Sequence, residues 1–124
     1  MKVGVIISSD DPVTLYVAAT YIATELARGN EVVVFVTGRA TLAFAGRSVP
    51  HETPEVKKMR ELHVMWDELL SAAKPMGVKI IACETASKIF GIAEEDYKTV
   101  KLVDAISSMY TFLEEVGEGR VMTF

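Results

Sequence analysis

The sequence predicts an α/β protein, a three-layer α/β/α sandwich with a mainly parallel five-stranded sheet. Three nearly continuous apolar runs, at residues 1–8, 31–37 and 78–83, are typical of strands covered on both faces. Helical patterns separate these runs, and crossovers of this kind make neighbouring strands parallel. The 124 residues contain no repeat, linker or low-complexity segment, so we expect one domain over residues 1–124.

The first strand is expected to end in the polar segment 8–12, where a helix begins. Asp11 is a suitable N-cap, and Pro12 at the first helical position loses no hydrogen bond. The helix should run to about Arg28. It is apolar or small nearly all round, which predicts burial on more than one side. We expect one side to meet the sheet and another to meet a second subunit; cover by the chain's own neighbours is the alternative.

The segment 40–52 is the least regular part of the chain, with a short helix expected at 41–45. An amphipathic helix is then predicted from Thr53 to Ala73, because its apolar residues recur at helical spacing. His63 falls on the apolar face of this helix, so we expect a core or interface histidine rather than a catalytic base. His51 lies in the long loop, and nothing in the sequence places it near a site.

The C-terminal third is expected to hold a short helix after the third strand and a weak, polar edge strand at 98–103. Asp104 is predicted to cap the last helix, which Gly117 ends, and residues 119–124 can add a fifth strand. The side chains expected on the inner face of that helix are Ile106, Met109, Phe112, Leu113 and Val116.

Composition excludes several classes of protein. The net charge is −4 and the 13 Lys and Arg residues are scattered, which argues against nucleic-acid binding. No apolar run approaches the roughly 20 residues of a membrane span. The chain opens on a strand pattern without a signal-like leader, so we expect a cytoplasmic protein. Because 50% of the residues are hydrophobic, part of the apolar surface is expected in a homo-oligomer interface.

Cys83 is the single cysteine, which excludes an internal disulfide, a CxxC redox pair and a cysteine-rich metal site. It stands where the third strand passes into a helix, and a helix N-terminus stabilises anions such as a thiolate. Lys88 could add positive charge, whereas Glu84 opposes it. The alternative is a buried cysteine that acts as a small hydrophobe.

The carboxyl ends of parallel neighbouring strands meet at one edge of a sheet, where ligands usually bind. Polar residues follow the first two strands there and could line a pocket with Cys83; helix capping and turn formation are the alternative explanation. The phosphate-binding patterns GxGxxG and GxxxxGK[ST] and the hydrolase pattern GxSxG are absent. The predicted pocket residues are Ser8, Ser9, Asp10, Thr37, Gly38, Thr85 and Lys88.

Several segments together resemble the DsrE/DsrF-like family of small sulfur-relay proteins. They are GVKIIAC at 77–83, the following residues 84–92 and the acidic triplet at 94–96, with further similarity at 2–9 and 33–37. The resemblance implies a five-stranded parallel sheet and assembly into trimers or hexamers. It also implies that the cysteine after the third strand accepts a sulfane sulfur as a persulfide, and Cys83 occupies that position.

The resulting hypothesis is a sulfur carrier or sulfurtransferase-like protein with Cys83 as the nucleophile. The chemistry needs no metal or organic cofactor, only donor and acceptor proteins or small thiols. The alternative is a non-enzymatic, oligomeric small-ligand or protein-binding module. In that alternative Cys83 is buried, and Ser9, Thr37 and Thr85 bind a polar group.

Overall fold

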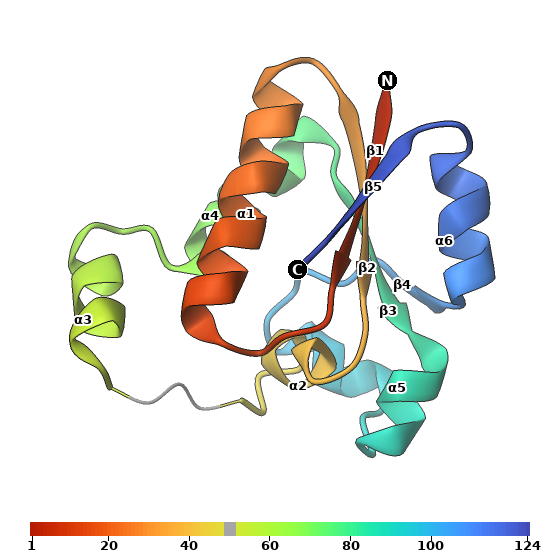
Figure 1. Ribbon diagram of the computed structural model, residues 1–124. Helices are drawn as coiled ribbons and strands as arrows, with labels where there is room; N and C mark the ends of the chain where they lie inside the picture. Colours follow the sequence, from red (N-terminus) through yellow and green to blue (C-terminus); the bar gives the residue numbers. More distant parts are fainter. Residues whose placement is uncertain (49–51) are drawn as a thin grey trace.

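The computed structural model describes residues 1–48 and 52–124, so His51 lies outside the described residues. Helices cover both faces of a central sheet, as the sequence predicts (Figure 1). The strands are β1 (Lys2–Ile7), β2 (Glu31–Val36), β3 (Lys79–Cys83), β4 (Ala105–Ser107) and β5 (Arg120–Thr123). The α-helices are α1 (Pro12–Ala27), α2 (Ala40–Phe44), α3 (Pro54–Glu61), α4 (Trp66–Ala73), α5 (Glu84–Ile89) and α6 (Met109–Val116), with 3-10 helices η1 (Lys74–Met76) and η2 (Glu94–Lys98).

The strand order is β4-β3-β2-β1-β5, and every neighbouring pair is parallel. The sequence predicted a mainly parallel sheet, which is confirmed. It left the strand order open, and the structure places the first three strands next to one another. In the central register Ile7 pairs with Val36, and Val36 pairs with Ala82. The residues that follow these three therefore leave the sheet side by side.

One face of the sheet is covered by α1 and α4 (Figure 1). Asp11 caps α1 as expected, since its carboxylate accepts a hydrogen bond of 2.9 Å from the Thr14 N–H. Alternate strand residues point to this face, as the two-residue period of a strand requires. The larger core cluster includes Val5, Val34 and Ile80 from the strands, Leu15 and Ile22 from α1, and Leu70 from α4.

The opposite face is covered by α6, whose Phe112 and Val116 are buried against the strands. The Phe112 ring lies 5.4 Å from that of Phe35 in β2. Met109 and Leu113, predicted to point inward, are 40% and 46% exposed instead. Only one stripe of this short helix therefore reaches the sheet.

The fourth strand is not where the sequence placed it. Residues 98–103 end η2 and form turns, and Lys101 has a left-handed backbone with φ 65° that an extended strand does not allow. Asp104 does not cap a helix either; its carboxylate accepts from the Ile80 N–H at 2.8 Å and pairs with Lys74. Ile106 lies in β4, and Ser108 caps α6.

The predicted helix from 53 to 73 is two helices, α3 and α4. The break lies at His63, whose φ of 57° is left-handed and incompatible with a continuous helix. His63 is therefore not a core histidine: its side chain is 83% exposed, and Nδ1 lies 3.6 Å from Glu68.

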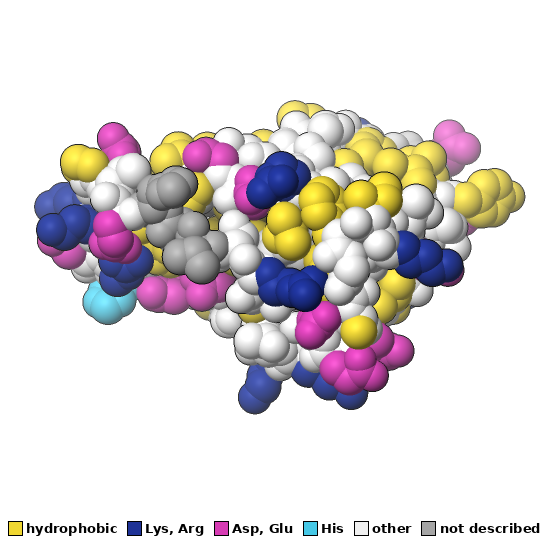
Figure 2. All heavy atoms as spheres, turned by 90° about the horizontal axis from the view of Figure 1, so that it is seen from below, with side chains coloured by type: hydrophobic (Ala, Val, Ile, Leu, Met, Phe, Trp, Pro, Cys, Tyr) yellow, Lys and Arg dark blue, Asp and Glu magenta, His cyan; other side chains and the backbone are white. Residues whose placement is uncertain are grey.

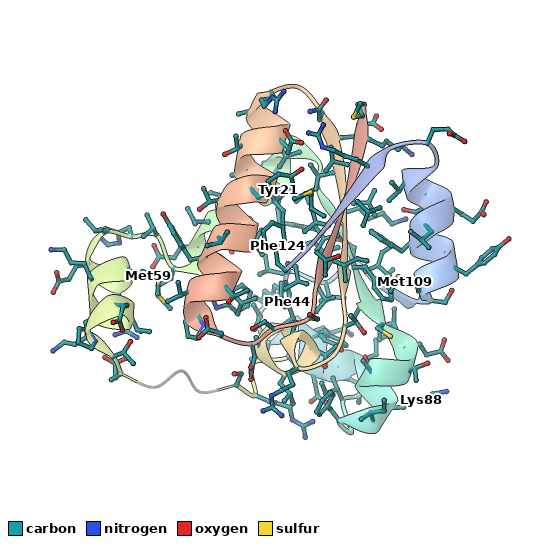
Figure 3. All side chains as sticks on the ribbon, viewed as in Figure 1. Tyr21, Phe44, Met59, Lys88, Met109 and Phe124 are labelled. Atoms are coloured by element: carbon teal, nitrogen blue, oxygen red, sulfur yellow. The ribbon has the colours of Figure 1, made fainter. Side chains whose placement is uncertain are left out.

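Helix α1 packs on the sheet and also on α4 of the same chain, which is the cover that the sequence left as an alternative. Val13 and Val17 nevertheless remain 43% and 46% exposed. Near β5, the edge strand opposite β4, the rings of Tyr21 and Phe124 lie tilted against each other with their centroids 5.6 Å apart (Figure 3). Along the described parts of the chain, no helix is long and apolar enough to span a membrane.

Candidate functional site

Cys83 ends β3 and is the N-cap of α5, as the sequence predicted. Its backbone is extended, with φ −69° and ψ 123°, so the chain turns into the helix directly after it. The thiol is free and half-buried. Cys83 is therefore neither fully enclosed nor fully exposed.

The Cys83 side chain points to the α6 face of the sheet, where it packs against the cluster that contains Ile81 and Phe112. Its Sγ accepts a hydrogen bond of 3.4 Å from the Ala86 N–H, one of the free donors of the first helical turn. The contact places a main-chain donor directly at the Cys83 sulfur.

Two buried hydroxyl groups lie behind Cys83. The Ser87 hydroxyl donates a hydrogen bond of 2.7 Å to the Cys83 carbonyl oxygen and lies 2.6 Å from the Tyr97 hydroxyl. Burial raises the pKa of Tyr97 and outweighs the hydrogen bond with Ser87, which lowers it, so the phenol keeps its proton. Sequence reasoning missed both residues, and the only signal was the four-residue spacing of Ser87 from Cys83, which places a hydroxyl over a helical carbonyl.

The ends of β1 and β2 lie beside Cys83 in the sheet order, as expected. The Thr37 N–H donates to the Ile7 carbonyl at 2.9 Å, and a Cβ on Gly38 would lie 3.1 Å from the Ser8 carbonyl oxygen. Gly38 also has a φ of 53°, so glycine suits this close crossing. The Ser8 hydroxyl donates to the Phe124 carbonyl at 3.1 Å and so ties the chain's C-terminal residue to β1.

The remaining residues after β1 serve mainly in turns and ion pairs. Ser9 Oγ accepts from the Asp11 N–H at 3.0 Å, which is the turn role that the sequence left open. Asp10 lies 3.4 Å from Arg39 and accepts from the Ser48 hydroxyl at 3.3 Å. Figure 2 shows this side of the molecule, where basic and acidic side chains alternate with apolar ones.

Thr85 and Lys88 are exposed on α5. The Lys88 ammonium pairs with Glu84 at 3.2 Å, and Figure 3 shows it at the outer end of the helix. Its charge is thus directed to Glu84 and solvent rather than to Cys83. Within residues 1–48 and 52–124, no group of three or more His, Cys, Asp or Glu side chains is arranged to hold a metal ion.

A cavity of about 490 Å³ lies at the outer edge of β4, away from the residues predicted from the sequence. It could not be found by pattern, because it forms between β4 and the segment that was mistaken for that strand. None of the predicted site residues lines it. Its lining consists of Glu94, Tyr97, Lys98, Lys101, Val103, Asp104, Ala105 and Ile106.

Comparison with known proteins gave one family and several similar structures. The model of the DsrE/DsrF-like family matches residues 1–124, whereas no curated protein matches significantly. The conserved protein of unknown function BT1422 from Bacteroides thetaiotaomicron is 17% identical, with a TM-score of 0.62 over 99% of this chain and 94% of its own.

Two further structures share the fold along nearly the full length of both chains. MTH1491 from Methanobacterium thermoautotrophicum, also a protein of unknown function, has a TM-score of 0.70 at 13% identity and covers 99% of this chain and 98% of its own. The ychN protein from E. coli has a TM-score of 0.58 at 20% identity, with both chains covered completely.

Proposed function

This chain belongs to the DsrE/DsrF-like family, and on that premise we propose that it is a sulfur carrier that receives sulfane sulfur on Cys83 and passes it to a partner. The observation that carries the proposal is the position of Cys83 as the N-cap of α5, with Sγ 3.4 Å from the Ala86 N–H. A thiol that is half-buried rather than enclosed still admits a small sulfur donor.

The first transfer is a displacement at sulfur. The Cys83 thiolate attacks the terminal sulfur of a donor persulfide, R–S–SH, and a new S–S bond forms on Cys83 as the donor's S–S bond breaks. The electron pair of the broken bond leaves with the donor as its thiolate, RS⁻. The second transfer repeats these steps with the thiolate of an acceptor, so neither step needs a metal, an added oxidant or an organic cofactor.

The test is the intact mass of the protein after incubation with glutathione persulfide. Wild type should gain about 32 Da, which dithiothreitol should remove, and Cys83→Ser should gain nothing. If wild type gains no mass, or if Cys83→Ser gains it equally, the carrier proposal is wrong.

The packing of Cys83 against the apolar cluster around Phe112 supports a second candidate function, a binding module in which the cysteine is structural. Iodoacetamide labelling separates the two. A carrier should be labelled in its native state within minutes, whereas a structural cysteine should react slowly until the protein is unfolded.

The carrier acts as a homo-oligomer, a trimer or hexamer, in the cytoplasm. The exposed Val13 and Val17 on α1 support an interface there, because they lie on the side that the sheet and α4 leave uncovered. Light scattering at micromolar concentration measures the assembly directly. A monomer mass would contradict it, and Val17→Glu should lower the mass of an oligomer.

A further inference from the structure

Strand β4 has an unpaired edge. It is the outermost strand, and within the described residues only β3 pairs with it. The Asp104 N–H donates to the Ile80 carbonyl at 2.8 Å, toward β3. The backbone groups of Ile80 face β4, and so do those of Ala82, two residues further along the strand. Because Ala82 lies opposite Ile106 in the parallel register, it bonds to the residues on either side of Ile106. The N–H and C=O of Ile106 therefore point away from β3 and offer a main-chain donor and acceptor to an incoming strand.

The cavity of about 490 Å³ runs along this same edge, which we term the β4 groove. Residues 103–106 form one wall of the groove. Tyr97 and Lys98 of η2, with Glu94 and Lys101, form the other. Space for another chain therefore exists where the free main-chain groups point.

The β4 groove is positively charged on a chain whose net charge is −4. Lys98 and Lys101 are exposed, and neither belongs to an ion pair found among the described residues. Asp104 is neutralised by Lys74, which leaves Glu94 as the one unneutralised acidic group of the lining. The groove thus complements an acidic ligand.

Lys101 adds an independent observation. Its φ of 65° lies in the left-handed region, which is unfavourable for every residue with a side chain and is normally occupied by glycine. A lysine held there presents its ammonium group at the groove at a conformational cost. Such strained positions concentrate at binding sites.

We propose that the β4 groove binds an extended, acidic segment of a partner protein, which joins the sheet as a strand beside β4. Main-chain hydrogen bonds to Ile106 supply the pairing, and carboxylates of the segment meet Lys98 and Lys101. An extended peptide suits this surface because the groove follows a strand edge. Short, lysine-bearing edges also deter unwanted strand pairing, which is the competing explanation that the experiment distinguishes.

The position of the groove relates it to Cys83. Ser107 pairs with Cys83 in the sheet register, so a segment running parallel to β4 leaves the groove at the edge where the thiol lies. The strand added there would run about 10 Å from β3, two strand spacings away. Delivery of a partner's cysteine to Cys83 is a corollary that rests on the proposed function; binding of the segment does not.

The probe is a short peptide of alternating valine and glutamate with both ends blocked. Its binding to the full chain is measured from the shifts of the protein's amide NMR signals. We expect a Kd below about 1 mM, with the largest shift at the amide of Ile106. A valine–lysine peptide should not bind, nor should a version whose central residues are proline, which cannot donate to the sheet. Absence of shifts at β4, or equal binding of the lysine peptide, overturns the proposal.

Matched variants test the lysines. Lys98→Gln and Lys101→Gly should each weaken binding about twofold to fivefold, the size expected for exposed ion pairs. Lys57→Gln, at an exposed lysine on α3, is the control and should leave the Kd unchanged. Lys101→Gly also relieves the left-handed backbone, so its melting temperature should not fall and weaker binding cannot be attributed to unfolding. Unchanged affinity in both groove variants contradicts the proposal.

Two further results separate this inference from the sulfur-carrier proposal and from self-association through β4. Cys83→Ser should bind the peptide as wild type does, so failure of sulfur uptake and failure of peptide binding are independent outcomes. If Ile106→Pro, which removes the outward-facing N–H of β4, lowers the subunit number in light scattering, β4 is an interface between copies of this chain, and the partner proposal is wrong.

Discussion

The Ser87 hydroxyl donates to the carbonyl oxygen of Cys83 at 2.7 Å and, with its proton used there, accepts from Tyr97 at 2.6 Å. Ser87 and Tyr97 are 4% and 3% exposed, so solvent cannot replace either partner. The junction between β3 and α5 is thereby fixed from its buried side, while the thiol remains on the α6 face.

Ser87→Ala should therefore destabilise the protein by about 1–3 kcal/mol, because it leaves a buried phenol and a carbonyl without their partner. Tyr97→Phe should cost less, about 0.5–1.5 kcal/mol, since the bond from Ser87 to Cys83 survives. Urea unfolding of both variants and of the double variant measures the coupling. Strictly additive losses of unfolding free energy would show that the two hydroxyl groups do not act as one hydrogen-bonded network.

Glu25 on α1 should make stability depend on pH. The carboxylate is 1% exposed and pairs with Arg120 of β5 and with Arg28, and it accepts a hydrogen bond from Tyr21. Burial raises its pKa, but the hydrogen bonds from Arg120 and Tyr21 and the two arginine charges lower the pKa below the usual value overall. Ionised Glu25 therefore stabilises the folded state.

With the folded pKa below the unfolded one, this stabilisation is present above about pH 4.3 and is lost as the pH falls through the folded value. Glu25→Gln should lower the urea midpoint at pH 7, and its difference from wild type should narrow at more acidic pH. Glu114→Gln, at an exposed position on α6, is the matched control. If the difference in urea midpoint between Glu25→Gln and wild type did not change with pH, the ionised carboxylate of Glu25 would not contribute to stability.

Gly4 in β1 lies directly under α6. A Cβ there would come within 2.6 Å of Val116 Cγ2 and 2.9 Å of Phe112 Cζ. Gly4→Ala should destabilise by about 1–3 kcal/mol, because α6 must move off the sheet. Thermal unfolding of Gly4→Ala/Val116→Ala tests the cause: the double variant should lose less than the sum of the single losses, and a neutral Gly4→Ala would contradict the close contact.

His63 should be replaceable without loss of the core. Its side chain is exposed and its backbone is left-handed, so His63→Gly should raise stability by about 0.5–1 kcal/mol. His63→Ala, which keeps the unfavourable φ, should change stability by less than about 0.5 kcal/mol. The urea midpoints of both variants measure these changes. A large loss of stability in His63→Gly would mean that the imidazole ring packs against apolar residues.

The strands with long apolar runs could be predicted because burial on both faces dictates their composition, and parallel order follows from the crossovers. The switch at Cys83 was visible for the same reason, since apolar character ends there. Strand β4 was not, because three residues leave no period to recognise, and Leu102 in the misassigned segment is buried by tertiary packing instead. The apolar spacing from Met59 to Trp66 likewise hides a break that only backbone dihedrals reveal.

The candidate site was predictable only in part. A thiol at a strand end follows from sequence, as does the close approach of Ser8 and Gly38 at the ends of β1 and β2. The hydroxyl of Tyr97 reaches Ser87 only because η2 folds back behind α5, and the β4 groove exists only because the strand starts after Asp104. Such features depend on contacts between separate elements, which local patterns do not encode.

The pairing of β1 with β5 joins residues from opposite ends of the chain, Val3 beside Arg120. During synthesis on a ribosome, β1 emerges first, but its outer edge stays open until residues 120–123 have left the exit tunnel. The nascent chain therefore presents an unpaired apolar strand edge while the intervening residues are made, and the sheet can be completed only after β5 has emerged.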